Sequence, residues 1–132
     1  MSAVAAESRT INLFLVEDSA ALVRRLEEML AAIEGVRIVG SAGSAEDAIR
    51  RILALRPDAV LCDIRLTQGT GFDVLRALRE QAPDVAVYML SNFVTEPYRR
   101  LAAQLGARDF FDKSSELGRM RAAVAARAAA QH

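Results

Sequence analysis

Four short apolar segments of the chain each end in residues that can act on a phosphoryl group or hold a metal ion. The first ends in Glu17 and Asp18, the second in Asp63, the third in Ser91 and the fourth in Lys113. In an open parallel sheet, ligands bind in the crevice outside the carboxyl ends of the strands. If these segments are parallel strands, three carboxylates, a hydroxyl and an ammonium meet at one edge. We therefore expect a site for a divalent cation and a phosphoryl group.

The residue types suit that chemistry, although each has a simpler alternative. Two adjacent carboxylates, Glu17 and Asp18, repel one another unless a cation such as Mg²⁺ relieves the repulsion; the alternative is an acidic loop before a helix. Asp63 could be a metal ligand or a nucleophile that accepts phosphate, or only a turn or helix cap. Ser91 could donate to a phosphoryl oxygen or serve as a turn residue. Lys113 is the only lysine in a chain with a Lys+Arg count of 17, which favours a dedicated role.

Composition limits the class of protein. The 132 residues are 52% hydrophobic and 26% charged, as in a globular protein of one domain. A formal net charge of +0 gives no reason to expect nonspecific binding to nucleic acid or to an anionic membrane. The single cysteine, Cys62, lies in an apolar segment and is expected to be a small buried residue. No apolar stretch has the length of a membrane span and no signal peptide opens the chain, so we expect a cytoplasmic protein.

Apolar segments typical of buried parallel strands alternate with segments of helical periodicity. The expected strands cover residues 11–16, 36–42, 59–62, 85–90 and 109–112. Five strands alternating with five helices predict an α/β, doubly wound sheet with right-handed crossovers. Residues 1–9 are expected to form a flexible tail, and residues 10–130 a single domain.

Small polar residues mark the expected helix ends. Ser19 and Ser44 are predicted N-caps, and Gly35 is predicted to end the first helix. A fourth helix is expected from about 96 to 105. Either serine of the pair 114–115 is expected to cap the last, alanine-rich helix.

Together these positions resemble the receiver domain of two-component response regulators, of the CheY-like, single-domain kind. The resemblance extends from about Ile11 to Ala126 and rests on five fragments in the correct order: 15–18, 62–66, 69–71, 90–91, and 106–107 followed by Phe110 and Lys113. It implies a flavodoxin-like sheet with strand order 2-1-3-4-5.

The resemblance also implies roles for individual residues. Asp63 would be the phosphoacceptor, receiving phosphate from a sensor histidine kinase or a histidine phosphotransfer protein as 4-aspartylphosphate. Asp18 and Asp63 would bind Mg²⁺ directly, helped by the backbone carbonyl of Arg65, while Glu17 would act largely through water. The metal would withdraw charge from the transferring group.

Further positions imply a switch. Ser91 and Lys113 would grip the phosphoryl oxygens, and Phe110 occupies the position of the switch aromatic residue, which turns inward as Ser91 moves toward the phosphate. The downstream protein target would bind the surface made by the fourth helix, the fifth strand and the fifth helix. Neither direct nucleic-acid binding nor membrane binding is expected.

Some positions depart from the family pattern. Many receivers have proline after the lysine, but Ser114 follows Lys113, so the geometry of that loop does not follow from the resemblance. Arg65 and Phe93 lie two residues beyond Asp63 and Ser91, near the expected path of attacking water. We predict that they tune the lifetime of the phosphoryl group, with the bulk of Phe93 slowing hydrolysis.

Three other functions are compatible with parts of the pattern. The chain could be the receiver half of a DNA-binding transcriptional regulator, which a linker and a basic helix-turn-helix after residue 132 would establish. It could be a degenerate receiver that no longer accepts phosphate, although all five chemical positions hold competent residue types. An aspartate-nucleophile phosphatase would need a second acid at the position of Arg65. The favoured function is a phosphoacceptor switch that is not an enzyme beyond its own phosphorylation and dephosphorylation.

Overall fold

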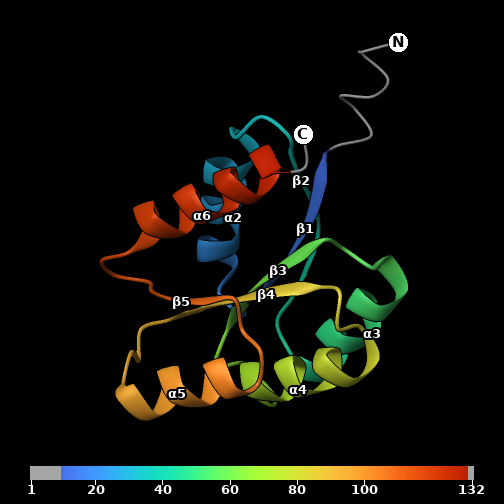
Figure 1. The fold of residues 1–132 in the computed structure, drawn as a ribbon, viewed down its shortest axis with the longest axis vertical. Helices are drawn as coiled ribbons and strands as arrows, with labels where there is room; N and C mark the ends of the chain where they lie inside the picture. Colours follow the sequence, from blue (N-terminus) through green and yellow to red (C-terminus); the bar gives the residue numbers. More distant parts are fainter. Residues whose placement is uncertain (1–9, 131–132) are drawn as a thin grey trace.

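The computed structural model describes residues 10–130, in which five parallel strands alternate with five helices (Figure 1). The strands are β1 (Ile11–Val16), β2 (Val36–Ala42), β3 (Ala59–Asp63), β4 (Ala86–Ser91) and β5 (Asp109–Asp112). The helices are α2 (Ala20–Ala31), α3 (Ala45–Leu55), α4 (Gly71–Gln81), α5 (Glu96–Gln104) and α6 (Leu117–Ala130). The sheet order is β2-β1-β3-β4-β5, which confirms the predicted fold class. The tail predicted for residues 1–9 lies outside the described residues.

Helices cover both faces of the sheet. In Figure 1, α2 and α6 lie on one face, and α3, α4 and α5 lie on the other. Successive residues of β1 alternate between these layers: Leu13 and Leu15 pack in the cluster under α2 and α6, whereas Phe14 and Val16 pack in the opposite cluster. Burial on both faces explains why β1 is a continuous apolar run instead of an alternating one.

Side-chain caps fix where the helices begin, and therefore where the loops of the site begin. Ser19 caps α2 and Ser44 caps α3, as predicted, each accepting a hydrogen bond from a backbone N–H three residues on. At α4, Thr70 and Asp73 form a capping box in which each side chain accepts from the other's backbone N–H.

Two predicted helix ends are wrong. The first helix, α2, ends at Ala31, four residues before Gly35. The chain then turns with Ile33 buried in the core, so an apolar residue that matched the helical spacing belongs to a turn. Gly35 has φ +85 and lets the turn lead into β2. The last helix, α6, begins at Leu117, so neither Ser114 nor Ser115 caps it.

Cys62 is fully buried next to Asp63, as expected for a small core residue. Burial raises the pKa of its thiol well above the ordinary range, so the thiol stays protonated. None of the helices within residues 10–130 combines the length and apolar character that a membrane span requires.

Candidate functional site

The carboxyl ends of the strands bring the predicted acidic residues together. Glu17 and Asp18 directly follow β1, and Asp63 is the last residue of the neighbouring strand β3. Each of these carboxylates offers an oxygen, and the three oxygens lie within 4.8 Å of one another. Glu17 and Asp63 are buried, whereas Asp18 is exposed. The cluster therefore combines two buried carboxylates with one that solvent can reach.

Lys113 closes the cluster from β5. Its Nζ donates to Asp63 Oδ2 at 2.6 Å and lies 2.8 Å from Glu17 Oε1, with the lysine side chain only 12% exposed. The contact with Glu17 is an ion pair without hydrogen-bond geometry. Glu17 Oε1 is buried and has no hydrogen-bond donor within the described residues. One ammonium thus faces three carboxylates, and the cluster keeps a net negative charge.

The electrostatics of the cluster follow from burial and from this ion pair. Burial raises the pKa of Glu17 above its usual 4.5, and Lys113 offsets part of that rise. Burial alone would lower the pKa of Lys113, but its contacts with Asp63 and Glu17 outweigh burial and raise the pKa above 10.5. Lys113 is therefore a fixed positive charge at neutral pH. Glu17 Oε2 accepts from the N–H of Ser19 at 3.0 Å, but the buried Oε1 has no hydrogen-bond donor within the described residues. A buried carboxylate oxygen of this kind suits a hard, oxygen-binding cation, so the donor set fits Mg²⁺.

Asp63 and Ser91 end adjacent strands, and both are buried. Asp63 Oδ1 accepts a hydrogen bond from the N–H of Ile64 at 2.7 Å, which leaves Oδ2 to Lys113. The hydroxyl of Ser91 accepts from the N–H of Phe93 at 3.0 Å, and the carbonyl of Ser91 accepts from the N–H of Lys113. Ser91 thus connects the loop after β4 with the segment that carries the lysine.

The loop after Asp63 contains two features that position the site. A Cβ at Gly71 would lie 2.0 Å from the carbonyl oxygen of Asp63, so only glycine permits this close approach of α4 to β3. The hydroxyl of Thr67 donates to Asp18 Oδ2 at 3.4 Å, and its N–H donates to the carbonyl of Gly43. The contact from Thr67 was not anticipated, because the sequence shows only that proline is absent there.

Arg65 and Phe93 are brought into contact. The guanidinium carbon of Arg65 lies 4.1 Å from the centroid of the Phe93 ring, so the loops after Asp63 and Ser91 are joined by a cation–π stack. Phe93 is 43% exposed, one of two large apolar side chains left exposed within the described residues. Sequence reasoning placed both residues at the rim but did not anticipate their stacking.

Phe110 is buried in the core layer under α3, α4 and α5. The guanidinium carbon of Arg99, from α5, lies 5.4 Å from the centroid of its ring. The aromatic side chain therefore points inward and is covered from outside by an arginine. In the same structure, with Phe110 pointing inward, Lys113 is paired with Asp63.

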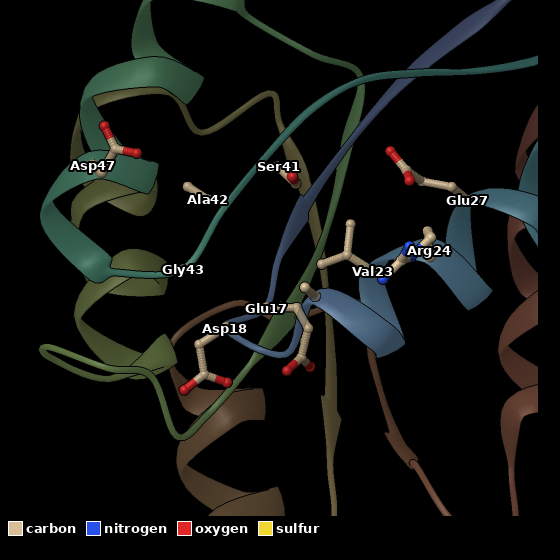
Figure 2. Close-up of a pocket in the computed structure, with 10 residues that line it drawn as sticks. Glu17, Asp18, Val23, Arg24, Glu27, Ser41, Ala42, Gly43 and Asp47 are labelled. Atoms are coloured by element: carbon tan, nitrogen blue, oxygen red, sulfur yellow. The ribbon is translucent and has the colours of Figure 1, made fainter.

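An open groove of about 490 Å³ adjoins the acidic cluster (Figure 2). It lies between α2 and α3 beside the end of β2, with Glu27 and Asp47 on its two helical sides. The groove contains Glu17 and Asp18 of the site but neither Asp63 nor Lys113. In Figure 2 the carboxylates of Glu17 and Asp18 point the same way, away from Ser41 and Ala42.

Comparisons with known proteins agree with this geometry. The family model "Response regulator receiver domain" matches residues 13–125. The chain is 33% identical over 111 residues to the response regulator GacA of Pseudomonas aeruginosa, covering 83% of this chain and 52% of GacA. It is 33% identical over 108 residues to protein-glutamate methylesterase/protein-glutamine glutaminase 3 of Geobacter sulfurreducens, covering 82% of this chain and 29% of that protein.

Among solved structures, the signal receiver domain of the putative response regulator NarL from Mycobacterium tuberculosis superposes with a TM-score of 0.83 at 25% identity, covering 91% of this chain and 97% of that domain. The chain spans about half or less of the length of the two curated relatives, 52% and 29%. The residues that the family model matches include Glu17, Asp18 and Asp63 of the acidic cluster.

Proposed function

Because the chain belongs to the family of response regulator receiver domains, we propose that Asp63 accepts a phosphoryl group from a phosphohistidine of a sensor histidine kinase or a histidine phosphotransfer protein. In this step a carboxylate oxygen of Asp63 bonds to phosphorus as the phosphorus–nitrogen bond of the donor breaks, and the histidine nitrogen leaves with the bonding electrons. The observation that carries the proposal is the buried Asp63 carboxylate, which lies beside two further acids and is bonded to Lys113.

We further propose that the acidic cluster holds Mg²⁺ during the transfer. Asp18, Asp63 and the carbonyl of Arg65 would bind the ion, and Glu17 would act through water. When bound, the ion withdraws charge from the phosphoryl oxygens and so eases their approach to a carboxylate. The net negative charge of the cluster and the accessible position of Asp18 support this assignment.

Lys113 and Ser91 are proposed to hold the phosphoryl group after transfer. Lys113 would exchange its bond with Asp63 for one with a phosphoryl oxygen, since an ammonium pairs well with phosphate as a point charge. The Ser91 hydroxyl would turn its proton toward another oxygen. Its present hydrogen bond from the N–H of Phe93 uses only its acceptor capacity, so the hydroxyl proton is free to donate.

Arg65 and Phe93 are proposed to set the phosphoryl lifetime. Their stack joins the two loops that follow Asp63 and Ser91, and water must pass this rim to reach the acyl phosphate. We expect the apolar ring of Phe93 to slow hydrolysis by excluding water. Both the stack and the partial exposure of the ring support the proposal.

The output is proposed to be a binding event. Residues 10–130 would act as one domain in the cytoplasm, whose own chemistry is limited to gain and loss of phosphate. The face made by α5, β5 and α6 would bind a downstream protein, with Phe110 as the switch residue behind it. The cover of Arg99 over Phe110 supports this choice, because it couples a surface side chain on α5 to the inward ring.

A direct test is incubation with a small phosphodonor and Mg²⁺, followed by intact mass measurement. We expect wild type to gain the mass of one phosphoryl group and Asp63→Asn to gain none. Chelation of the metal should abolish the gain. Failure of wild type under conditions that label a known receiver would indicate a degenerate receiver instead.

A further inference from the structure

The loop that carries Lys113 is closed by two side chains, Asp112 and Glu116. The N–H of Asp112 donates to Glu116 Oε1 at 2.9 Å, and the N–H of Glu116 donates to the carbonyl of Asp112 at 2.8 Å. Asp112 Oδ1 also accepts from the N–H and the hydroxyl of Ser114, at 2.8 Å and 2.6 Å. Lys113 is thus enclosed in a turn whose two ends bond to each other.

This turn determines where the ammonium can reach. The backbone N–H of Lys113 donates to the carbonyl of Ser91 at 3.0 Å, and its Nζ donates to Asp63 at 2.6 Å. Hydrogen bonds weaken steeply once the separation or angle departs from these values. A displacement of the Asp112–Lys113 backbone by about 1 Å would therefore shift the starting point of the lysine side chain and weaken its bond to Asp63.

Glu116 is itself held from two directions. Its Oε2 accepts from Arg119 of α6 at 2.5 Å, and its Oε1 lies 3.7 Å from a guanidinium nitrogen of Arg99 on α5. Its side chain is 22% exposed. Glu116 directly precedes α6, which is anchored in the core by Met120 and Val124. The packing of α6 therefore restrains the position of the Glu116 carboxylate, which in turn restrains the turn around Lys113.

We propose that Glu116 is a positioning residue for Lys113: its Oε1 holds the Asp112 N–H and thereby places the lysine ammonium on Asp63. The restraint that many family members obtain from a proline after the lysine comes here from a carboxylate three residues beyond it. The relevance to phosphoryl transfer rests on the proposed function, whereas the positioning of the ammonium does not.

The pKa of Glu116 is consistent with this role. The hydrogen bond from the backbone of Asp112, followed by the bond from Arg119, lowers this pKa below 4.5, so the carboxylate is ionised at neutral pH. Glu116 could therefore act through its negative charge or through the length of its side chain, which lets Oε1 reach the Asp112 N–H. The experiment must separate these two contributions.

Two variants make that separation. Glu116→Gln keeps the length of the side chain and an oxygen acceptor for Asp112 but loses the charge. Glu116→Asp keeps the charge but is one methylene too short for the 2.9 Å bond. Arg121→Ala is the matched control, because it removes an exposed arginine of α6 that makes no ion pair with Glu116. The proposal requires that side-chain length, and not charge, decides whether the lysine ammonium stays on Asp63.

The only lysine of the chain offers a direct readout that needs no phosphorylation. Protein labelled at lysine with ¹³C and ¹⁵N gives one side-chain signal, which reports on the surroundings of Lys113. In Glu116→Gln and Arg121→Ala we expect this signal to keep its wild-type position. In Glu116→Asp it should move toward the position of a solvated lysine, while backbone spectra show an intact fold.

Phosphorylation by a small phosphodonor with Mg²⁺ is the second readout. Glu116→Asp should be slower by on the order of tenfold or more, as expected when a reacting group is misplaced, and Glu116→Gln should recover most of the wild-type rate. If Glu116→Asp keeps the wild-type lysine signal, or if Glu116→Gln loses it, the positioning role is wrong. Lack of phosphorylation in wild type would contradict the proposed function alone, because the lysine signal still decides this inference.

Discussion

Replacement of Lys113 by methionine should make the stability of the domain depend on a divalent cation. Methionine fills a similar volume but leaves the buried carboxylates of Glu17 and Asp63 without their cation. Removing one partner of a buried ion pair costs about 3–5 kcal/mol. The lysine side chain is 12% exposed at the open edge of the sheet, so we take the lower value, about 3 kcal/mol.

This free energy corresponds to a measurable shift in melting temperature. At about 2.1 cal/mol/K of unfolding entropy per residue, a chain of 132 residues has about 0.28 kcal/mol/K. A loss of about 3 kcal/mol then lowers the Tm by about 11 °C. The raised pKa of Lys113 means that its stabilisation is complete below pH 10.5 and is lost only as the pH rises through the folded-state value. The full deficit should therefore be present at neutral pH.

Mg²⁺ should reverse the loss. An ion at a hundredfold excess over its Kd stabilises by about 2.7 kcal/mol, which is close to the predicted deficit. Because wild type already has an ammonium in the cluster, Mg²⁺ should raise its Tm less than that of Lys113→Met. Acid should also narrow the gap: without Lys113 the pKa of Glu17 rises further, and its protonation removes a buried charge.

The assay is thermal unfolding with chelator and with Mg²⁺, and exposed Arg100→Met serves as the control for loss of a cation. The reasoning would be refuted if Lys113→Met melted at the wild-type temperature in chelator. An equal Mg²⁺-induced shift in both proteins would refute the part that concerns metal binding.

Three further changes test other parts of the account. Gly71→Ala places a Cβ 2.0 Å from a carbonyl oxygen of β3 and should cost about 1–3 kcal/mol in urea unfolding, whereas Gly118→Ala, in open space on α6, should not destabilise. A small or absent cost for Gly71→Ala would mean that the loop relaxes freely. Phe93→Ala should shorten the phosphoryl lifetime about two- to fivefold, because an exposed cation–π stack that closes the rim contributes about 0.5–1 kcal/mol. Leu55→Ala, which also truncates an exposed apolar residue, is the control. An unchanged lifetime in Phe93→Ala would rule out the rim as a barrier to water. The pKa of Glu116 lies below 4.5, so its ionisation stabilises the fold above pH 4.5 and that stability is lost as the pH falls through the folded value. Glu116→Gln should accordingly lose less stability than wild type between about pH 5 and about pH 3, and equal slopes would contradict the lowered pKa.

The strand-end residues could be predicted because their placement depends on topology alone. A run of core residues buried on both faces implies a parallel strand, and the carboxyl ends of such strands share one edge. Asp63 and Lys113 are 50 residues apart in the chain, yet the ends of β3 and β5, on either side of β4, bring their side chains to 2.6 Å. No knowledge of loop conformation was needed for this part of the site.

Contacts made by the loops could not be predicted, because they depend on backbone angles that side-chain patterns do not encode. The stack of Arg65 on Phe93 requires two loops to converge, and Thr67, which bonds to Asp18, lies in a loop that turns at Gly69, where φ is +76. Glu116 gives no periodic signal. Serine is a favoured N-cap residue, so propensity pointed to the pair 114–115 instead of to Glu116, which directly precedes α6 and bonds to Asp112.

The central claim is that Asp63 carries the phosphoryl group. Its most direct test is to label the protein with a small phosphodonor and Mg²⁺, reduce the acyl phosphate with borohydride, and map the reduced side chain by peptide mass spectrometry. The account predicts reduction at Asp63 alone. Modification at Asp18 or Ser91 with Asp63 untouched, or no phosphorylated species at all, would contradict it.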